Sequence, residues 1–188
     1  MAAMGFTALK FDVPSVKCDY GGETPTEISN VVDDMSDDVK MVGGCMCGAV
    51  RYETTGQSFG VVHCHCHSCR KHNGAPVVTL AGYKQEQVKF TGDERSFYQS
   101  SQDAVRAYCG NCGTPLTWEG DGGELGPIVE LHLSTFDDPD ILVPTAHAFY
   151  PERIAWFDVA DNLPRYEGFA ELSPLLRHGP ISDDLPSN

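Results

Sequence analysis

Seven of the eight cysteines in this 188-residue chain lie in three short clusters, and these clusters are the residues best suited to chemistry. The clusters are Cys45-Met-Cys47, Cys64-His-Cys66-His-Ser-Cys69 and Cys109-Gly-Asn-Cys112. In an extended strand, residues two apart point to the same face, so each C-x-C pair can present two sulfurs to one centre. In the third cluster Gly110 and Gly113 allow the backbone to fold around the sulfurs. Soft sulfur ligands favour zinc, with iron as the less favoured occupant.

The seven sulfurs divide into a group of four and a group of three. A structural zinc site is closed by four protein ligands, whereas a catalytic site commonly has three and an open position. Cys64, Cys66 and Cys69 lie within six residues and can surround one ion alone, so we predict that they form the open, catalytic site. The other clusters offer two sulfurs each, and together they predict a closed site made of Cys45, Cys47, Cys109 and Cys112.

An open site of three thiolates predicts a reaction of a thiol. Zinc with three thiolates favours a further sulfur ligand, and coordination deprotonates a thiol at neutral pH. The bound thiolate can then attack a small carbonyl compound. The alternative is that His72 supplies a fourth ligand and makes the second site purely structural.

Further polar residues surround the second cluster. If a strand continues through residue 66, His63 and His65 face away from the cysteines and are poor ligands. Arg70 and Lys71 follow Cys69 directly, and they offset the anionic sulfurs, bind a substrate carboxylate, or are solvated surface cations. The same alternatives apply to Arg106, just ahead of the third cluster.

The charge of the chain limits its partners. The 27 acidic and 13 basic side chains give a net charge of −14, which disfavours binding to nucleic acid or to an anionic membrane. No apolar run has the length of a membrane span, and the first residues lack the order of a secretory signal. We therefore expect a cytoplasmic protein with small-molecule partners, whose thiols stay reduced. The oligomeric state stays open.

The elements that position the cysteines are expected to be strands. Nine short runs with period-two alternation, bounded by Gly, Pro, Asp or Ser and without a helical stripe, predict an all-β, β-dominated single domain. They are AVRYETT, FGVVHC, PVVTLAGY, QVKFTG, RSFYQS, AVRAYC, PLTWEG, IVELHLS and TAHAFY.

The composition of the two ends predicts flanking segments. Residues 1–41 are expected to form an acidic N-terminal extension with a short strand at residues 8–13, residues 42–171 the zinc-binding catalytic domain, and residues 172–188 a C-terminal tail. The acidic run 33–38 is interpreted as a solvated linker, with a docking tail for a basic partner as the alternative. Cys18 is interpreted as a free thiol.

The chain resembles the glutathione-dependent formaldehyde-activating enzyme family, also called the centromere protein V family, over residues 43–169. The segments that carry the resemblance are GGCMCGAVRY, CHCHSCRK, GAP, YCGNCGTPL, DDP, the histidine of PTAHAFY, and LPRYEG. The resemblance implies a zinc-containing β-tent fold and two zinc ions, one structural and one catalytic, divided among the cysteines as above. It also implies that glutathione sulfur binds at the catalytic zinc and that glutathione and formaldehyde combine reversibly into S-hydroxymethylglutathione.

These observations predict a zinc-dependent carbon–sulfur lyase acting on a glutathione adduct of formaldehyde or another small carbonyl compound. Its catalytic residues would be Cys64, Cys66, Cys69 and His147, with Arg70 and Lys71 binding glutathione. For His147, a hydrogen-bonded core histidine is the equal alternative to a proton donor or acceptor. Trp156, Phe157 and Tyr166 are expected in the core.

Two other functions remain open. The sequence departs from the family in the long segment before the first cysteine pair and in the Ala-Phe-Tyr that follows His147, where isoleucine and tryptophan are usual. One alternative is therefore a zinc enzyme of the same scaffold that acts on a different small metabolite without glutathione. The other is a non-catalytic, zinc-stabilised protein-binding module, which predicts a second site closed by His72.

Overall fold

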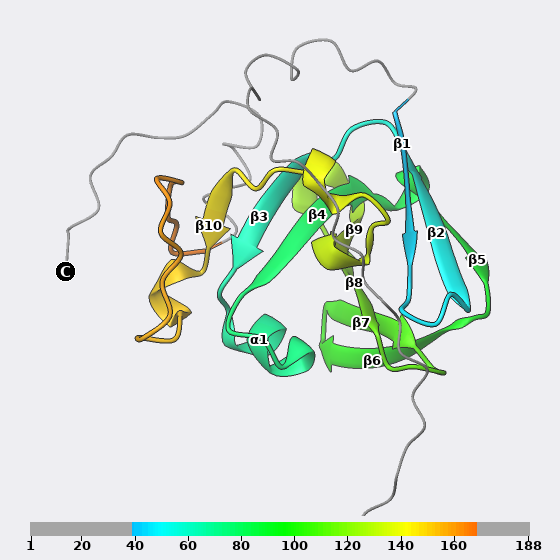
Figure 1. Ribbon diagram of the computed structural model, residues 1–188, viewed down its shortest axis with the longest axis horizontal. Helices are drawn as coiled ribbons and strands as arrows, with labels where there is room; N and C mark the ends of the chain where they lie inside the picture. Colours follow the sequence, from blue (N-terminus) through cyan, green and yellow to red (C-terminus); the bar gives the residue numbers. More distant parts are fainter. Residues whose placement is uncertain (1–38, 169–188) are drawn as a thin grey trace, which may run out of the picture. The chain divides into compact units, whose positions relative to one another are not determined.

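The computed structural model describes residues 39–168, which are built mainly from β-strands and include one α-helix, α1 (His67–Asn73) (Figure 1). The predicted β-dominated class is confirmed. The predicted strand at residues 8–13, Cys18, the acidic run 33–38 and the tail 172–188 lie outside the described residues. Within residues 39–168 no helix is long and apolar enough to cross a membrane.

Strands β1 (Lys40–Gly44), β2 (Val50–Thr55) and β5 (Val88–Gly92) form an antiparallel sheet in the order β1-β2-β5. A seven-stranded sheet has the order β10-β3-β4-β9-β8-β7-β6, in which only β10 pairs in parallel, with β3. Its strands are β3 (Gly60–Cys64), β4 (Val78–Lys84), β6 (Arg95–Ser101), β7 (Ala104–Cys109), β8 (Pro115–Asp121), β9 (Pro127–His132) and β10 (Ala146–Ala148).

Short 3₁₀ turns connect several strands. They are η1 (Gln85–Gln87), η2 (Gly123–Leu125), η3 (Leu133–Thr135), η4 (Pro139–Ile141) and η5 (Tyr150–Glu152). Each of the nine predicted runs coincides with one of the strands β2 to β10. Strand β1 was not predicted, and it includes Lys40 and Met41, which were expected in the N-terminal extension. Its sequence KMVGG has only five residues and ends in two glycines, so it lacks the alternating pattern.

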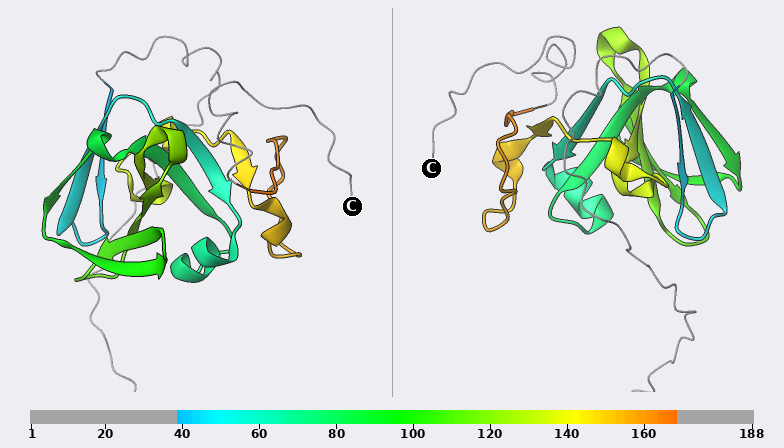
Figure 2. Two further views of the ribbon diagram at one scale, coloured as in Figure 1. Left: turned by 180° about the vertical axis from the view of Figure 1, so that it is seen from behind. Right: turned by 45° about the horizontal axis from the view of Figure 1, so that its top comes forward.

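The main core lies between the two sheets (Figure 2). Val50 and Tyr52 alternate inward on β2, and the Tyr52 ring packs edge-on against Phe136 with a centroid distance of 5.3 Å. From the seven-stranded sheet, Val61, Tyr83 and Leu131 belong to the same cluster, while their strand neighbours point to the opposite face. The seven-stranded sheet therefore has one face in the core and a second face free to line a site.

The register of the seven-stranded sheet places two charged residues in one row on that second face. Gly82 on β4 pairs with Glu130 on β9, Glu130 pairs with Trp118 on β8, and Trp118 pairs with Arg106 on β7. Side chains of paired residues lie on the same face of a sheet. Arg106, Trp118 and Glu130 are therefore neighbours, although they come from three separate segments of the sequence.

Helix α1 lies between the end of β3 and the β6–β7 hairpin (Figure 1). Cys66 caps its start, because its Sγ accepts a hydrogen bond from the Cys69 backbone N–H at 3.3 Å. The helix ends at Gly74, whose φ of 61° is left-handed, a conformation that favours glycine. Seven residues span only two turns, so the sequence contains no apolar stripe that predicts this helix.

Candidate functional site

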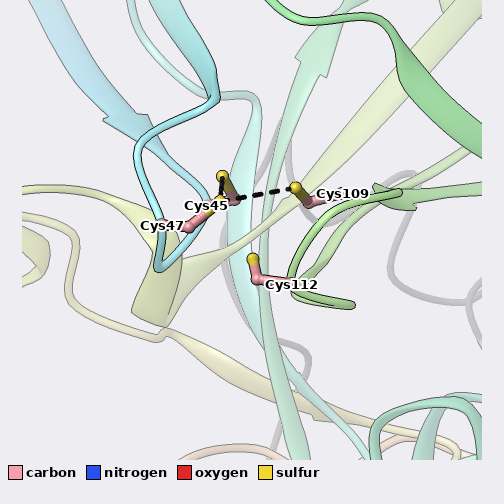
Figure 3. Close-up of side chains that lie close together, drawn as sticks. All are labelled: Cys45, Cys47, Cys109 and Cys112. Atoms are coloured by element: carbon pink, nitrogen blue, oxygen red, sulfur yellow. Dashed lines mark hydrogen bonds between the residues drawn. The ribbon is translucent and has the colours of Figure 1, made fainter. Parts of the chain in front are cut away.

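Cys45, Cys47, Cys109 and Cys112 form a cluster in which all four sulfurs lie within 4.8 Å of one another (Figure 3). Cys45 follows β1 and Cys109 ends β7, so the cluster joins the two sheets. All four cysteines are free, and the Sγ atoms of Cys47 and Cys109 are 3.8 Å apart. The structure thus brings together the four residues predicted for the closed site, and the donor set is the one that structural zinc uses.

Local backbone geometry prepares these sulfurs for a metal ion. Gly113 has a φ of 76°, which turns the chain after Cys112. Gly110, the other glycine predicted to fold the backbone around the sulfurs, does not have a positive φ. The Val50 backbone N–H donates to Cys45 Sγ at 3.2 Å, and such N–H···S bonds favour thiolate. Burial raises the pKa of Cys112, but hydrogen bonding, chiefly with Thr114, outweighs burial and lowers that pKa to about 6.

Cys64, Cys66 and Cys69 form a second cluster, again with all sulfurs within 4.8 Å. Cys64 ends β3, Cys66 caps α1, and Cys69 lies in the first turn of the helix. Hydrogen bonds from the other two cysteines lower the pKa of Cys66, so the cluster favours a thiolate at that position. Three convergent sulfurs fit the ligand set of a zinc ion with an open position.

His72 does not join the second cluster. In the described part of the chain, the groups that could hold a metal ion include Cys64, Cys66 and Cys69 without any histidine or carboxylate. The His72 ring instead faces His132, with 6.5 Å between the ring centroids, and its Nε2 is buried without a hydrogen-bond partner. The geometry thus favours the open site over the alternative of a fourth ligand from His72.

A cavity of about 380 Å³ opens directly onto the second cluster. Cys66, Ser68 and Cys69 reach it from the start of α1, and Cys64 reaches it from the second face of the seven-stranded sheet. The remaining lining residues are Val62, Leu80, Ser100, Ser101, Ala104, Arg106, Trp118, Glu130, Ala148, Phe149 and Glu152. The cavity is thus mostly apolar with a few polar groups, which is typical of a small-molecule site.

Arg106 and Glu130 are the buried charged residues of this cavity, with exposed fractions of 3% and 8%. Arg106 Nη2 donates to Cys69 Sγ at 3.5 Å, which favours the site alternative for this residue over a surface cation. Burial raises the pKa of Glu130 to about 7. Glu130 was not predicted as a site residue, although a carboxyl group within the apolar run from Ile128 to Leu131 marks it in the sequence.

His147 does not line the cavity. On β10 its neighbours Ala146 and Ala148 share the face of Val62 and Cys64, so His147 points to the opposite face together with His63. There it is completely buried, with Nδ1 2.8 Å from His65 Nε2 and Nε2 3.1 Å from both carboxylate oxygens of Asp161. The structure therefore favours the alternative of a hydrogen-bonded core histidine.

His63 points to the face of β3 opposite Cys64, as expected from strand geometry, whereas β3 ends at Cys64, so the expected strand does not include His65. His63 Nδ1 lies 2.8 Å from Thr79 Oγ1, and neither histidine lines the cavity. Burial and the nearby His147 lower the pKa of His65 to about 4, so this ring is neutral at pH 7.

The two cations after Cys69 differ in their surroundings. Arg70 Nε donates to the His65 carbonyl and Nη2 to the Glu152 carbonyl, each at 2.8 Å, so its guanidinium joins α1 to two loops. Lys71 is exposed, and neither residue is part of the cavity lining.

The expectation of a core position is wrong for Trp156, which is 79% exposed. Phe157 and Tyr166 are partly buried, and Tyr166 packs against Val62, Ala146 and Ala148.

The fold and the site define a class of protein: a β-sheet domain with one four-sulfur cluster and one three-sulfur cluster that opens onto a cavity. Among known families, the model of the glutathione-dependent formaldehyde-activating enzyme matches residues 40–152, which is more than half of the chain. The chain belongs to this family, which confirms the resemblance seen in its cysteine motifs.

Two individual proteins are also similar to the chain. An uncharacterized lyase of Schizosaccharomyces pombe is 30% identical over 74 residues, which cover 39% of this chain and 53% of that protein. The chain therefore matches about half the length of this curated relative. A crystal structure of a Rhodobacter sphaeroides protein, a structural genomics target, is 16% identical with a TM-score of 0.43 and covers 67% of this chain and 100% of that one.

Proposed function

We propose that the protein is a zinc-dependent carbon–sulfur lyase that acts on the glutathione adduct of formaldehyde or of another small carbonyl compound. The observation that carries this proposal is the cluster of Cys64, Cys66 and Cys69 at the wall of the cavity, without a fourth protein ligand in residues 39–168. Family membership and the lyase name of the curated relative support the same reaction class.

The residues of the cavity have complementary roles in this proposal. Cys64, Cys66 and Cys69 would hold zinc, which when bound supplies one position for a thiol and stabilises its thiolate form. Arg106 offsets the negative charge of the sulfurs through its hydrogen bond to Cys69. The apolar wall, which includes Leu80 and Phe149, excludes water from the carbon that gains or loses the sulfur.

Glutathione recognition is proposed for the surface next to the cavity. Lys71 is exposed on α1, two residues after Cys69, and can pair with a glutathione carboxylate. The guanidinium of Arg70 already donates hydrogen bonds to the carbonyls of His65 and Glu152. We therefore propose that Arg70 holds α1 and these two loops in position next to the cavity. Cys45, Cys47, Cys109 and Cys112 would hold the structural zinc.

The charges of the cavity favour one second candidate, in which the same site acts on a small metabolite other than a glutathione adduct. Glu130 and Glu152 are carboxyl residues of the lining, and Arg106 is its guanidinium, already directed to Cys69. A tripeptide with two carboxylates finds little positive charge there. A small neutral or cationic substrate would be more compatible with this lining.

The test combines metal counting with a direct assay. Native mass spectrometry of protein purified without chelator should show two zinc ions per chain and a glutathione adduct. Exchange of ¹³C-formaldehyde into S-hydroxymethylglutathione, measured by NMR, should be faster with the wild-type protein than without it. Two zinc ions without any effect on this exchange would exclude the glutathione reaction and favour the second candidate.

A further inference from the structure

Glu130 is a buried carboxyl group that the rest of the fold does not use. Its side chain lies on β9 and lines the cavity, and it makes no hydrogen bond or ion pair with the other residues of the described range 39–168. A buried polar group without a partner destabilises a fold, so native proteins rarely contain one without a reason. Its position in a cavity suggests that a bound molecule supplies the missing partner.

Glu130 and the sulfur site line the same cavity from different elements of the fold. Glu130 pairs with Trp118 on β8, whereas Cys66 and Cys69 reach the cavity from α1. The lining thus contains both the three sulfur ligands and a carboxyl group from a separate strand. A molecule that spans the cavity would have its sulfur end at the cysteines and its oxygen end at Glu130.

The proposed reaction requires a group with these properties. In the adduct R–S–CH₂–OH, the carbon–sulfur bond breaks only as the hydroxyl proton leaves, and in the reverse direction the new hydroxyl oxygen must receive a proton. A general acid–base group within hydrogen-bond reach of that oxygen accelerates such a step by about 10²- to 10⁴-fold.

We propose that Glu130 is the catalytic acid–base residue that takes the hydroxyl proton of the thiol–carbonyl adduct and returns it in the reverse direction. This role rests on the proposed lyase function. In cleavage, the Glu130 carboxylate accepts the proton, and the O–H electron pair forms the second C–O bond. The electron pair of the C–S bond goes to sulfur, which departs as thiolate. Addition runs through the same step in reverse, so protons and electrons balance without an oxidant or reductant.

The surroundings of Glu130 support this role. Burial raises the pKa of Glu130 to about 7, so both protonation states are populated at neutral pH. The charged groups that face it are Arg106 from β7, which lowers that pKa, and Cys66 at the start of α1, which raises it. Its paired neighbours, Gly82 on β4 and Trp118 on β8, carry no charge.

The experiment compares the wild-type protein with Glu130→Gln, which keeps the shape of the side chain and removes its acid–base function. The rate of ¹³C-formaldehyde exchange into S-hydroxymethylglutathione should fall by about 100-fold or more. Zinc content and the dissociation constant for glutathione should change less than about twofold, because the proposed partner of Glu130 is the hydroxyl group alone. Glu53→Gln removes an exposed carboxylate on β2, paired with Lys89, and serves as the matched control with wild-type rates.

Glu130→Asp is a second variant that retains a carboxyl group. It should recover part of the lost rate, which a purely structural role of the Gln substitution would not explain. Exchange within threefold of wild type in Glu130→Gln, or loss of zinc from that variant, would overturn the role of Glu130 while leaving the lyase proposal intact. Absence of exchange with the wild-type protein would instead overturn the proposed function and the role of Glu130 with it.

Discussion

Arg106 on β7 donates a hydrogen bond from Nη2 to Cys69 Sγ on α1, over 3.5 Å. This bond joins the seven-stranded sheet to helix α1, which contains Cys69 and is capped by Cys66. Because Arg106 is only 3% exposed, water screens its charge weakly, and the guanidinium favours the thiolate form of the cluster. Arg106 is thus a positioning residue of the candidate metal site.

Arg106→Lys should weaken zinc binding at the three-cysteine cluster by about 10- to 100-fold, because a compact ammonium on a flexible chain cannot reproduce the directed bond to Cys69. Competition with a chromophoric chelator measures the affinity of each zinc ion. Arg51→Lys is the matched control, since Arg51 pairs with Asp137 on the surface. Equal zinc affinities in wild type and Arg106→Lys would contradict this role of Arg106.

Cys66→Ser should remove the second zinc and the carbon–sulfur exchange activity while preserving the fold. Cys66 contributes one of three sulfurs, and its loss leaves only two at that site. Native mass spectrometry should therefore count one zinc per chain instead of two, and the far-UV circular dichroism spectrum should match that of wild type. Unchanged turnover in Cys66→Ser would contradict the assignment of the catalytic site. Cys18→Ser controls for the loss of a thiol outside the described residues.

Cys109→Ser should instead affect stability. Cys109 is 1% exposed and belongs both to the four-sulfur cluster and to the core between the two sheets. Structural zinc contributes directly to folding free energy, so the variant should lose more than about 3 kcal/mol of unfolding free energy. Urea denaturation followed by tryptophan fluorescence measures this difference. A loss below about 1 kcal/mol would show that the cluster does not stabilise the fold.

The sequence predicted the strands and the sulfur groups because both depend on short-range patterns. Alternation within β2 marks one buried face without any knowledge of the partner strand. The C-x-C and C-x-x-C spacings bring sulfurs together through local geometry alone. Cys64, Cys66 and Cys69 are close enough in sequence to converge without the other cysteines, and the structure groups them in this way.

The cavity could not be predicted in the same way, because it depends on the order of strands in the sheet. Arg106, Trp118 and Glu130 come from three strands and become neighbours only through the register of β7, β8 and β9. The same limit explains why the sequence could not predict the direction in which the His147 side chain points. Its direction depends on the parallel pairing of β10 with β3, which leaves the histidine on the face opposite Cys64.

His147→Ala should reduce stability more than catalysis. The substitution removes the buried contact with His65 at 2.8 Å and the contact with Asp161 at 3.1 Å, and it leaves a cavity on the face away from the sulfurs. We expect a loss of about 2–4 kcal/mol in the free energy of unfolding. The exchange rate at 15 °C should stay within about tenfold of wild type. A 100-fold lower rate with unchanged stability would restore His147 to a catalytic role.

The protonation of Glu130 predicts how stability depends on pH. An unfolded glutamate titrates near 4.5, and burial raises the folded-state pKa of Glu130 to about 7. The folded state therefore binds more protons between these values, so the contribution of Glu130 to stability is complete below pH 4.5 and is lost as pH rises through 7. Glu130→Gln cannot titrate and should avoid this loss.

Urea denaturation of wild type and Glu130→Gln at pH 6 and pH 8 provides the measurement. The free energy of unfolding of the variant, relative to wild type, should rise by about 1 kcal/mol between pH 6 and pH 8, because wild type must ionise a buried carboxyl group over that interval. Effects of pH on the cysteines and on zinc occur in both proteins and largely cancel in the difference. The exposed control Glu53→Gln should show a difference from wild type that is independent of pH. If the difference in unfolding free energy between Glu130→Gln and wild type were also independent of pH, Glu130 would already be ionised at pH 6. The folded protein would then contain a charged carboxylate in the same cavity as the sulfur site.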